Sequence, residues 1–514
     1  MSLIYGPRAV PLEDDDPGTV GLDPTWVLPR RVRWWAEREP DRPFLTEVTG
    51  RSSSYGQTWQ DVLRWQSLLR RLGLQRGEAV LSLLPSSIDA HLLWLAAGSL
   101  GLLEVAVNPD LRGEFLRHAL TDSGARVCVV RPEHAALVAG AGVALQVVEV
   151  DRDGALVADL PPDDPYEVAP ADPACVLCTS GTTGPAKGVV VSWAQLSTTL
   201  GRLPRPWLGD QEVAYSYLPM SHVTGRSPLV SMAAVGGRVV LREKFSAQAF
   251  WTDVRTHRCT TTTALVSLLL AAPPADDDRD HPLRLAFGGS NVTQNVQFEQ
   301  RFGVHLISCY GSTEVGFPMV DRWLTPGVNR CGWLRAGYQA RLVDERGEDV
   351  APGSVGELWV RAPAPELRTS GYLNRPDLTA ATLVDGWFRT GDALVALPDG
   401  SFRFVDRLRD TIRRLGENIS ASALEAVVAG DPAVVLCAAL AVPDELVGQE
   451  VLLAVVLRDG DAAALWERLQ PQLPRLMHPR WIAVREELPL TASGKVRKDV
   501  LLGQLDLSAQ WSRP

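Results

Sequence analysis

Short runs rich in β-branched residues alternate with longer, helix-patterned stretches through about the first 400 residues of the chain. Residues 79–84, 127–130 and 147–150 have the length and composition of strands. A chain in which strands and helices alternate folds into layers, because helices cover the sheet faces that strands alone would leave exposed. The pattern therefore predicts a layered α/β fold, with sheets and helices packed into a large N-terminal domain.

The pattern changes at residues 402–406, which alternate as a strand and lead into the arginine-rich stretch 407–414. A chain of 514 residues, 46% of them apolar, is too long for one core. We therefore predict a large N-terminal domain at residues 1–408 and a small C-terminal domain at residues 409–514.

The C-terminal segment contains elements of its own. Ser422 and Glu425 have the S-x-x-E spacing of a capping box, which opens a helix that Gly430 can end. Residues 449–457 have the pattern of an apolar strand, and residues 462–469 that of a helix. The segment is therefore expected to fold as an α+β unit.

Charge and hydropathy exclude several classes of protein. A formal net charge of −10 argues against a general binder of nucleic acids or anionic membranes, which needs a basic surface. The apolar run at residues 92–103 is shorter than the ~18 residues of a membrane span, so we expect a buried helix and no membrane insertion. Acidic residues 13–16 stand where a secretory leader would be basic and then apolar, which predicts a cytoplasmic protein.

Seven cysteines without a framework spacing predict reduced thiols rather than disulfides. Cys175 and Cys178 form a C-x-x-C pair, but no second pair or clustered histidine completes a zinc site. The pair is therefore interpreted as part of a strand in the core.

A loop rich in glycine and hydroxyl residues occupies residues 178–188, between two strand-like runs. Glycines let backbone N–H groups approach a phosphate, hydroxyls donate further hydrogen bonds, and Lys187 adds a positive charge. Only four of the 51 basic residues are lysines, so a lysine at this place favours a specific use. Ala186 and Gly188 replace the glycine and the hydroxyl residue that flank the lysine of a Walker A loop. The loop is therefore predicted to bind a polyphosphate in a different manner.

Two further motifs suit a nucleotide. Residues 310–314 contain Y-G-S-T-E, in which Tyr310 can stack beside a purine, Thr313 can donate to a phosphate, and Glu314 can bind Mg²⁺ through hard oxygens. Asp392 ends the motif W-F-R-T-G-D and can accept hydrogen bonds from both ribose hydroxyls, while Arg407 can pair with ribose or phosphate oxygens. A solvated turn aspartate and a surface arginine are the alternatives for the last two residues.

More motifs follow in a fixed order along nearly the whole chain. They are L-P-M-S-H at residues 218–222, the segment from D-R to G-E-N-I at residues 406–419, and the segment from L-P to S-G-K at residues 488–495. With these motifs the chain resembles the adenylate-forming superfamily, which includes acyl-CoA synthetases, firefly luciferases and nonribosomal adenylation domains. Within that superfamily it looks closest to crotonobetaine/carnitine-CoA ligase-like enzymes.

The resemblance implies an AMP-forming acyl-CoA ligase that uses ATP, Mg²⁺ and coenzyme A. A carboxylate attacks the α-phosphorus of ATP, pyrophosphate leaves, and the CoA thiol then displaces AMP from the acyl-adenylate. The small domain is expected to rotate about a hinge at Arg409. It would present Lys495 for the first step and Gly416, which leaves room for pantetheine, for the second.

The expected site residues fall into three groups. The catalytic group is Lys495, His222, Thr313 and Glu314, with Glu314 as the metal ligand and His222 in a gating and positioning role. The group that holds ATP or CoA is Thr179, Ser180, Gly181, Thr182, Thr183, Gly184, Lys187, Gly288, Gly289, Ser290, Cys309, Tyr310, Gly311, Ser312, Asp392, Phe404, Arg407 and Gly416. The group that lines the acid pocket is Val223, Gly225, Arg226, Phe287 and Val315.

Two departures from the family pattern leave alternatives open. Ser221 replaces an aromatic residue, which would widen the pocket, and Leu415 stands where a small residue is usual. The second departure keeps open an enzyme specialised for thioesterification of a supplied acyl-adenylate. A stand-alone amino-acid adenylating enzyme is disfavoured because His222 replaces the aspartate that binds the substrate ammonium group. A non-catalytic nucleotide-binding protein is disfavoured because Lys187, Glu314 and Lys495 are all retained.

The acid itself is described only by class. The pocket candidates favour a small-molecule carboxylic acid with an apolar acyl group, and Arg226 either binds a second polar group of that acid or is solvated. Low lysine with abundant alanine, glycine, proline and arginine resembles a high-GC bacterium, so a secondary-metabolite acid is as plausible as a fatty acid. The sequence leaves both a monomer and a homodimer open.

Overall fold

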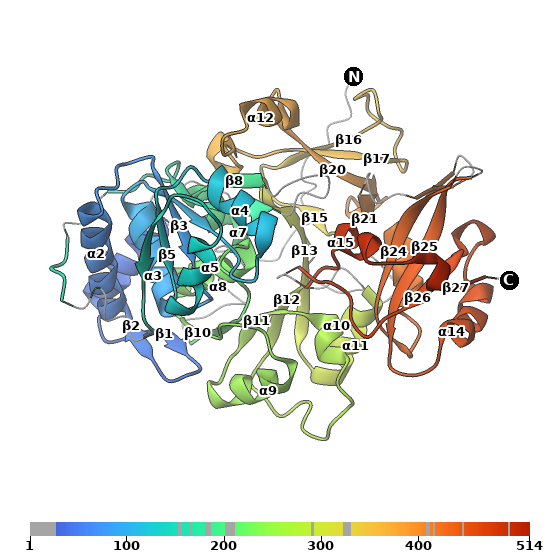
Figure 1. The fold of residues 1–514 in the computed structure, drawn as a ribbon, viewed down its shortest axis with the longest axis horizontal. Helices are drawn as coiled ribbons and strands as arrows, with labels where there is room; N and C mark the ends of the chain where they lie inside the picture. The colour runs from blue at the N-terminus through green and yellow to red at the C-terminus, as the bar shows by residue number, and fades with distance from the viewer. Residues whose placement is uncertain are drawn as a thin grey trace.

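The computed structural model describes residues 27–152, 157, 159–163, 167–179, 187–200, 211–288, 292–321, 330–407, 412–414, 417–444, 447–491 and 494–513. Figure 1 shows a large body, coloured from blue to orange, and a red C-terminal lobe beside it. The layered α/β body and the smaller lobe confirm the predicted fold class.

The first sheet of the body has seven strands in the order β18-β8-β7-β4-β3-β5-β6 within the described residues. The strands from β7 to β6 are parallel, while β8 and β18 run antiparallel at one edge. The predicted strands at residues 79–84, 127–130 and 147–150 are confirmed as β3, β5 and β6, with ends shifted by at most one residue. The bounds are β3 (Ala79–Leu83), β4 (Leu103–Ala106), β5 (Val127–Val130), β6 (Gln146–Glu149), β7 (Pro173–Thr179), β8 (Lys187–Ser192) and β18 (Gly371–Tyr372).

The second sheet has nine described strands in the order β15-β14-β13-β12-β11-β9-β10-β1-β2. Its central strands, from β1 to β13, are parallel. The bounds are β1 (Pro43–Glu47), β2 (Ser52–Ser54), β9 (Val213–Ser216), β10 (Arg238–Leu241), β11 (Thr261–Ala264), β12 (Leu285–Gly288), β13 (His305–Ser312), β14 (Gly316–Asp321) and β15 (Trp333–Leu334).

Helices cover and separate these two sheets. Every residue of α3 is buried, and one apolar core joins α3, α7 and α8 to strands of both sheets. The predicted buried helix is confirmed for residues 92–99, whereas residues 100–102 form the turn to β4, which starts at Leu103. The helices of the body are α1 (Leu28–Arg38), α2 (Tyr55–Arg71), α3 (Ile88–Ser99), α4 (Gly113–Asp122), α5 (Pro132–Ala139), α7 (Trp193–Leu200), α8 (Val223–Val235), α9 (Ala247–Thr256), α10 (Val266–Leu270) and α11 (Val292–Phe302).

A third, antiparallel sheet completes the body, at the top of Figure 1. Strand β20 lies at its centre and pairs with β17, β19 and β21. The predicted strand at residues 402–406 is confirmed as β21. The bounds are β16 (Gln339–Val343), β17 (Val355–Arg361), η2 (Pro365–Leu367), α12 (Pro376–Thr382), β19 (Leu383–Val384), β20 (Trp387–Ala396) and β21 (Phe402–Arg407).

The C-terminal lobe has a sheet of its own, and its two core clusters contain only residues from Ile412 onward. The predicted strand and helix after residue 448 are confirmed as β25 and α14. The predicted cap of α13 is wrong by two residues: Ser420 accepts the N–H of Ala423, while the Ser422 hydroxyl donates to the Val405 carbonyl. The bounds are β22 (Ile412–Arg414), β23 (Glu417–Ile419), α13 (Ala421–Val428), β24 (Val434–Asp444), β25 (Gly448–Leu457), α14 (Ala462–Leu469), η3 (Gln470–Gln472), η4 (Arg475–Met477), β26 (Trp481–Val484), α15 (Lys498–Gly503), η5 (Leu507–Ala509) and β27 (Trp511–Ser512).

Two expectations about the chain as a whole can be compared with this fold. The seven cysteines are free thiols, and Cys175 and Cys178 lie on β7 as predicted. None of the helices in the described ranges is long and apolar enough to cross a membrane.

A buried histidine on α3 is expected to make the stability of the fold depend on pH. Burial lowers the pKa of His91 from 6.5 to about 4. Between these values the unfolded chain binds a proton that the folded protein does not, so the free energy of unfolding should fall as the pH drops from about 6.5 to 4. The loss from this residue is at most roughly 3 kcal/mol. His91→Gln should make the slope shallower in urea titrations between pH 7 and 4, and an unchanged slope would contradict this assignment.

Candidate active site

Asp392 is held between two side chains at the end of the third sheet. Strands β20 and β21 place Asp392 opposite Arg407, whose Nε lies 3.3 Å from one carboxylate oxygen. The Tyr310 hydroxyl donates to the other oxygen at 2.7 Å. Burial and the charge of Asp392 raise the pKa of Tyr310 well above 10, so the phenol stays a donor. Three residues predicted to hold the nucleoside are thus in direct contact.

The Y-G-S-T-E motif forms the β13–β14 hairpin, whose register shifts between Tyr310 and Ser312. A Cβ on Gly311 would overlap the carbonyl oxygen of Gly316, so only glycine permits the close approach of the two strands. Gly288 has φ +151°, and a Cβ there would lie 2.6 Å from the carbonyl oxygen of Ala264. Both predicted ligand-binding glycines therefore also have a packing reason.

Glu314 and Lys187 come together through Tyr372. The Tyr372 hydroxyl donates to Glu314 Oε1 at 3.0 Å, and its ring centroid lies 5.9 Å from Lys187 Nζ. Strand β18 carries Tyr372 and pairs with β8, which begins at Lys187. The Glu314 carbonyl also accepts the N–H of Thr369 at 2.7 Å. The predicted metal ligand and the predicted phosphate-binding lysine thus share one neighbour.

Thr313 is fixed by its backbone, because Gln195 of α7 donates its side-chain amide to the Thr313 carbonyl at 2.6 Å. Neither Gln195 nor Tyr372 was identified from the sequence. Each belongs to a segment without a distinctive motif, and each contact joins residues far apart in the chain. Arg335 was also missed; it donates to the Phe317 carbonyl at 3.3 Å, and burial lowers its pKa.

His222 forms the N-cap of α8. Its Nδ1 accepts the N–H of Thr224 at 3.2 Å and lies 2.7 Å from the Thr224 hydroxyl. Burial and, to a smaller extent, the positive charge of Lys495 together lower the pKa of His222 to about 4. The ring is therefore neutral near pH 7, with its proton on Nε2. This state fits the predicted gating and positioning role better than that of a general base.

Lys495 lies on a loop of the C-terminal lobe that faces the body. Its N–H donates to the Thr491 hydroxyl at 3.0 Å. The preceding Gly494 has φ +80°, and a Cβ there would lie 2.9 Å from the side chain of Leu265, just before α10. The close approach to Leu265 places this loop against the body, and the charge of Lys495 contributes to the lowered pKa of His222.

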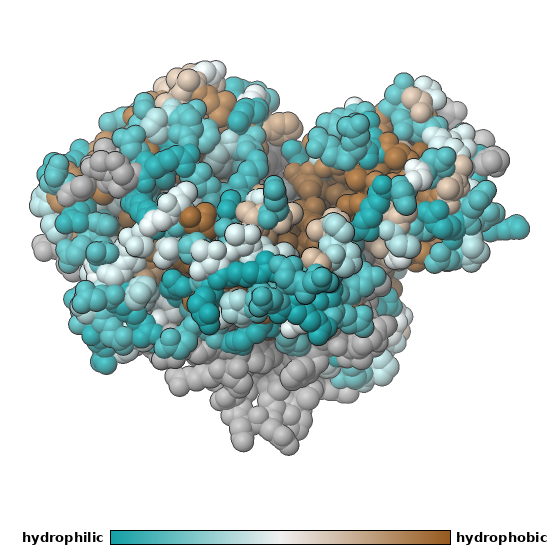
Figure 2. Space-filling model, turned by 90° about the horizontal axis from the view of Figure 1, so that it is seen from below, coloured by the Kyte–Doolittle hydropathy of each residue, from teal (hydrophilic) through white to brown (hydrophobic). Residues whose placement is uncertain are grey.

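Two further contacts join the lobe to the body. Arg458 donates to the Leu270 carbonyl at 3.2 Å, and the Arg497 guanidinium lies 5.3 Å from the Phe115 ring centroid. Figure 2 shows the boundary from below: a notch separates the lobe from the body, and apolar surface gathers beside it. The described orientation therefore brings the lysine loop close while leaving part of the boundary open.

The predicted acid-pocket residues differ in accessibility. Val223 and Phe287 are partly buried against the main core, whereas Val315 is fully buried. A side chain on Gly225 would overlap the Pro219 carbonyl oxygen. Arg226 has no exposed surface and pairs with Glu104 at 2.6 Å, so the expectation of a solvated arginine is wrong. The physical reason is that the arginine extends into the core, where a carboxylate of β4 balances its charge.

The remaining predicted residues lie on strands or outside the described part of the chain. Cys309 and Phe404 are partly buried, burial raises the pKa of Cys309 to about 12, and Thr179 ends β7. Among the described residues, no three His, Cys, Asp or Glu side chains are grouped to hold a metal ion. The predicted residues that lie outside the described part are Ser180, Gly181, Thr182, Thr183, Gly184, Gly289, Ser290, Arg409 and Gly416.

The sequence matches two family models. The model of the AMP-binding enzyme matches residues 32–373, and that of the AMP-binding enzyme C-terminal domain matches residues 423–495. A sulfoacetate–CoA ligase of Cupriavidus necator is 31% identical over 508 residues, which cover 93% of this chain and 96% of the relative. A crotonobetaine/carnitine–CoA ligase of Salmonella arizonae is 28% identical over 488 residues, covering 87% of this chain and 92% of the relative.

A solved structure has the same fold. The anthranilate CoA ligase AuaEII in complex with anthranoyl-AMP superimposes with a TM-score of 0.84 at 21% identity, covering 94% of this chain and 98% of that one. At this identity the likeness concerns the fold, and it extends over both the body and the C-terminal lobe.

The Tyr372 contact predicts a change in metal dependence. Tyr372→Phe removes the hydrogen bond that orients Glu314, so the Mg²⁺ concentration for half-maximal ATP-dependent activity should rise about threefold to tenfold, because one hydrogen bond contributes about 0.5–1.5 kcal/mol. Tyr215→Phe is the matched control, because the Tyr215 hydroxyl also donates to a carboxylate, that of Asp253, outside the candidate site. The same Mg²⁺ requirement in all three proteins would show that Tyr372 does not orient a metal ligand.

Proposed function

The chain belongs to the AMP-binding enzyme family and is an AMP-forming acyl-CoA ligase, and we propose that its acid carries an apolar acyl group and that the residues described above perform both steps. The substrates are ATP, coenzyme A and a carboxylic acid, with Mg²⁺ as the metal ion. The acid class, the site residues and the domain movement are the parts that we propose.

In the first step an oxygen of the acid's carboxylate attacks the α-phosphorus of ATP, and pyrophosphate leaves. Asp392, fixed by Tyr310 and Arg407, accepts hydrogen bonds from the ribose hydroxyls. Lys187 and the glycine-rich loop before it bind the phosphates. Lys495 stabilises the negative charge that develops as pyrophosphate departs.

Glu314 is the proposed Mg²⁺ ligand. Mg²⁺ in such sites is held by one or two carboxylates together with substrate phosphates and water, so a single oriented carboxylate fits it. Bound Mg²⁺ neutralises charge on the phosphates. The Tyr372 hydrogen bond occupies one acceptor position of the Glu314 carboxylate and leaves others to serve as metal ligands, because a carboxylate has about four such positions.

In the second step the CoA thiol attacks the acyl carbonyl and AMP leaves. We propose that residues 409–514 then rotate about Arg409 and bring Gly416 to the pantetheine path. The separate apolar cores of the lobe support a unit that can move as one body. The lobe contacts the body through Arg458 and Arg497, and the start of α13 forms three hydrogen bonds with Val405 and Asp406 of β21, close to the proposed hinge. This small set of contacts supports a reversible interface.

The Glu104 pair of Arg226 is the observation that favours an apolar acid. Arg226 is the cation that the sequence placed in the acid pocket, and Glu104 already neutralises it in the core. The remaining accessible candidates, Val223 and Phe287, are apolar. A sulfonate or a second carboxylate would gain no free cation from Arg226.

A panel of acids tests the proposed class. Benzoate and octanoate should give kcat/KM values at least about tenfold above sulfoacetate, because an apolar pocket rejects an unpaired charge. AMP and acyl-CoA formation would be measured together by chromatography. A preference for sulfoacetate would contradict the proposal. Acyl-CoA formed only from supplied acyl-adenylate, without pyrophosphate release from ATP and acid, would support the thioesterification alternative.

The two orientations of the lobe predict unequal effects on the two steps. Lys495→Ala should lower acyl-adenylate formation roughly 100- to 1,000-fold, as loss of one transition-state donor does, while sparing CoA transfer to supplied acyl-adenylate. Lys244→Ala is the control, since Lys244 is exposed and pairs with Asp110. Pyrophosphate release and thioester formation would be followed separately. Equal losses of rate in both steps would contradict the assignment of Lys495 to acyl-adenylate formation.

A further inference from the structure

The L-P-M-S-H motif is folded tightly over the start of α8. The His222 N–H donates to the Pro219 carbonyl at 3.0 Å, and the Gly225 N–H donates to the His222 carbonyl at 3.0 Å. The lack of a side chain at Gly225 lets the helix approach the same Pro219 carbonyl. These contacts are local, so they shape the loop without attaching it to the rest of the body.

Leu218 and Met220 pack into the apolar cores of the body, and Arg226 adds a polar attachment to that packing. Its Nε donates to the Met220 carbonyl at 2.8 Å, and its Nη2 donates to Glu104 Oε2 at 2.6 Å. Glu104 lies on β4, between β3 and β7 of the first sheet. The guanidinium carbon also lies 4.7 Å from the Trp94 ring centroid on α3. One side chain thus joins the loop before His222 to a central strand and to the buried helix layer.

Stability alone gives no reason for an ion pair at this place. Both side chains are completely buried, and burial raises the pKa of Glu104 while the Arg226 charge opposes that rise. A buried pair of this kind can often be replaced by apolar residues without loss of stability. Apolar residues would not donate to the Met220 carbonyl. The rigid, planar guanidinium can hold a carbonyl and a carboxylate at the same time.

We propose that Arg226, anchored by Glu104, is a positioning residue that fixes the loop at residues 218–222 and thereby sets His222 and the wall of the acid pocket. The proposal rests on the acyl-CoA ligase function proposed above. Arg226 acts on the acid indirectly, by positioning Met220 and His222, and does not contact the acid itself. Loosening the loop should therefore weaken use of the acid while leaving use of ATP nearly unchanged.

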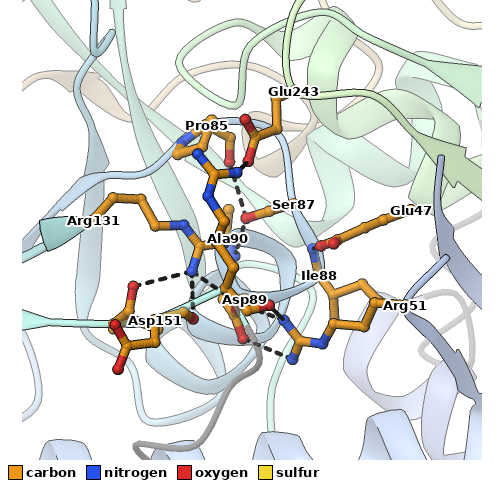
Figure 3. A network of polar contacts seen from close by, with 12 residues as sticks. Glu47, Arg51, Pro85, Ser87, Ile88, Asp89, Ala90, Arg131, Asp151 and Glu243 are labelled. Atoms are coloured by element: carbon orange, nitrogen blue, oxygen red, sulfur yellow. Dashed lines mark hydrogen bonds and ion pairs between the residues drawn. The ribbon is translucent and has the colours of Figure 1, made fainter. Parts of the chain in front are cut away.

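Another buried arginine offers a matched control, shown in Figure 3. Arg131 donates to the carbonyls of Val150 and Asp151 at 3.0 and 2.6 Å and lies 3.1 Å from Asp89, which Arg51 also binds. Like Arg226, it joins a buried carboxylate to backbone carbonyls. Its contacts lie outside the candidate active site. Removing it should cost stability without changing the KM of the acid.

Arg226→Lys is the main variant, because it retains a cation for Glu104 but loses the planar fork. We expect the KM of the best acid in the panel to rise about tenfold, with the KM of ATP within about twofold of the parent. Glu104→Leu/Arg226→Met is the second variant, and it should regain the thermal stability that Arg226→Met alone loses while keeping the raised KM. Arg131→Met should lower Tm and leave both KM values unchanged.

A stable double variant with the parent KM for the acid would overturn the proposal, as would a parent-like KM in Arg226→Lys. Hydrogen exchange separates this outcome from failure of the proposed function. Peptides covering residues 218–226 should exchange faster in Arg226→Lys, whereas peptides covering Arg131 should not change. This readout needs no substrate. Unchanged exchange at residues 218–226 would refute the anchoring even if no acid in the panel were used.

Discussion

The layer of helices buried between the two parallel sheets constrains the rest of the structure. No residue of α3 reaches solvent, and α8 lies in the same layer. His222 is the N-cap of α8, so part of the candidate active site is attached to a helix that cannot shift without disturbing both sheets. A polar side chain on α8 must find its partner inside the layer, which is why Arg226 meets Glu104 there. The proposed acid pocket is consequently built on a tightly packed layer of the body.

The two important carboxylates are each oriented by a phenol. Tyr310 donates to Asp392 and Tyr372 donates to Glu314, and the pKa of each phenol is raised by burial and by the neighbouring carboxylate. A neutral donor fixes Glu314 without cancelling its charge, so Glu314 can still bind a cation. Asp392 also pairs with Arg407, but a carboxylate has about four acceptor positions and can still accept hydrogen bonds from a ribose. An arginine in place of Tyr372 would hold Glu314 as firmly but would oppose metal binding.

The sequence predicts those features of the fold and site that depend on residues close together in the chain. Strands such as β5 and the helix α14 follow from period and composition, and Asp392 and Glu314 are found because each ends a recognisable motif that contains glycine. The sequence does not reveal contacts between distant segments. Tyr372 meets Glu314 only because β18 pairs with β8, and Arg226 is buried only because β4 supplies a carboxylate. The misplaced cap at Ser422 has the same origin, since the Val405 carbonyl attracts its hydroxyl.

His222 connects the rigid layer to the lobe, and the order of the two effects on its pKa matters. Burial is the larger cause of the lowered pKa, and the charge of Lys495 is the smaller. If the lobe rotates as proposed, the smaller contribution of Lys495 is lost and burial is left as the cause that lowers the pKa. In the described orientation the ring is neutral near pH 7. A neutral ring with a lowered pKa is a weak base, which favours the gating and positioning role that we propose for it. In that role the ring would contribute its Nε2–H donor and the shape that the loop before α8 gives to the pocket.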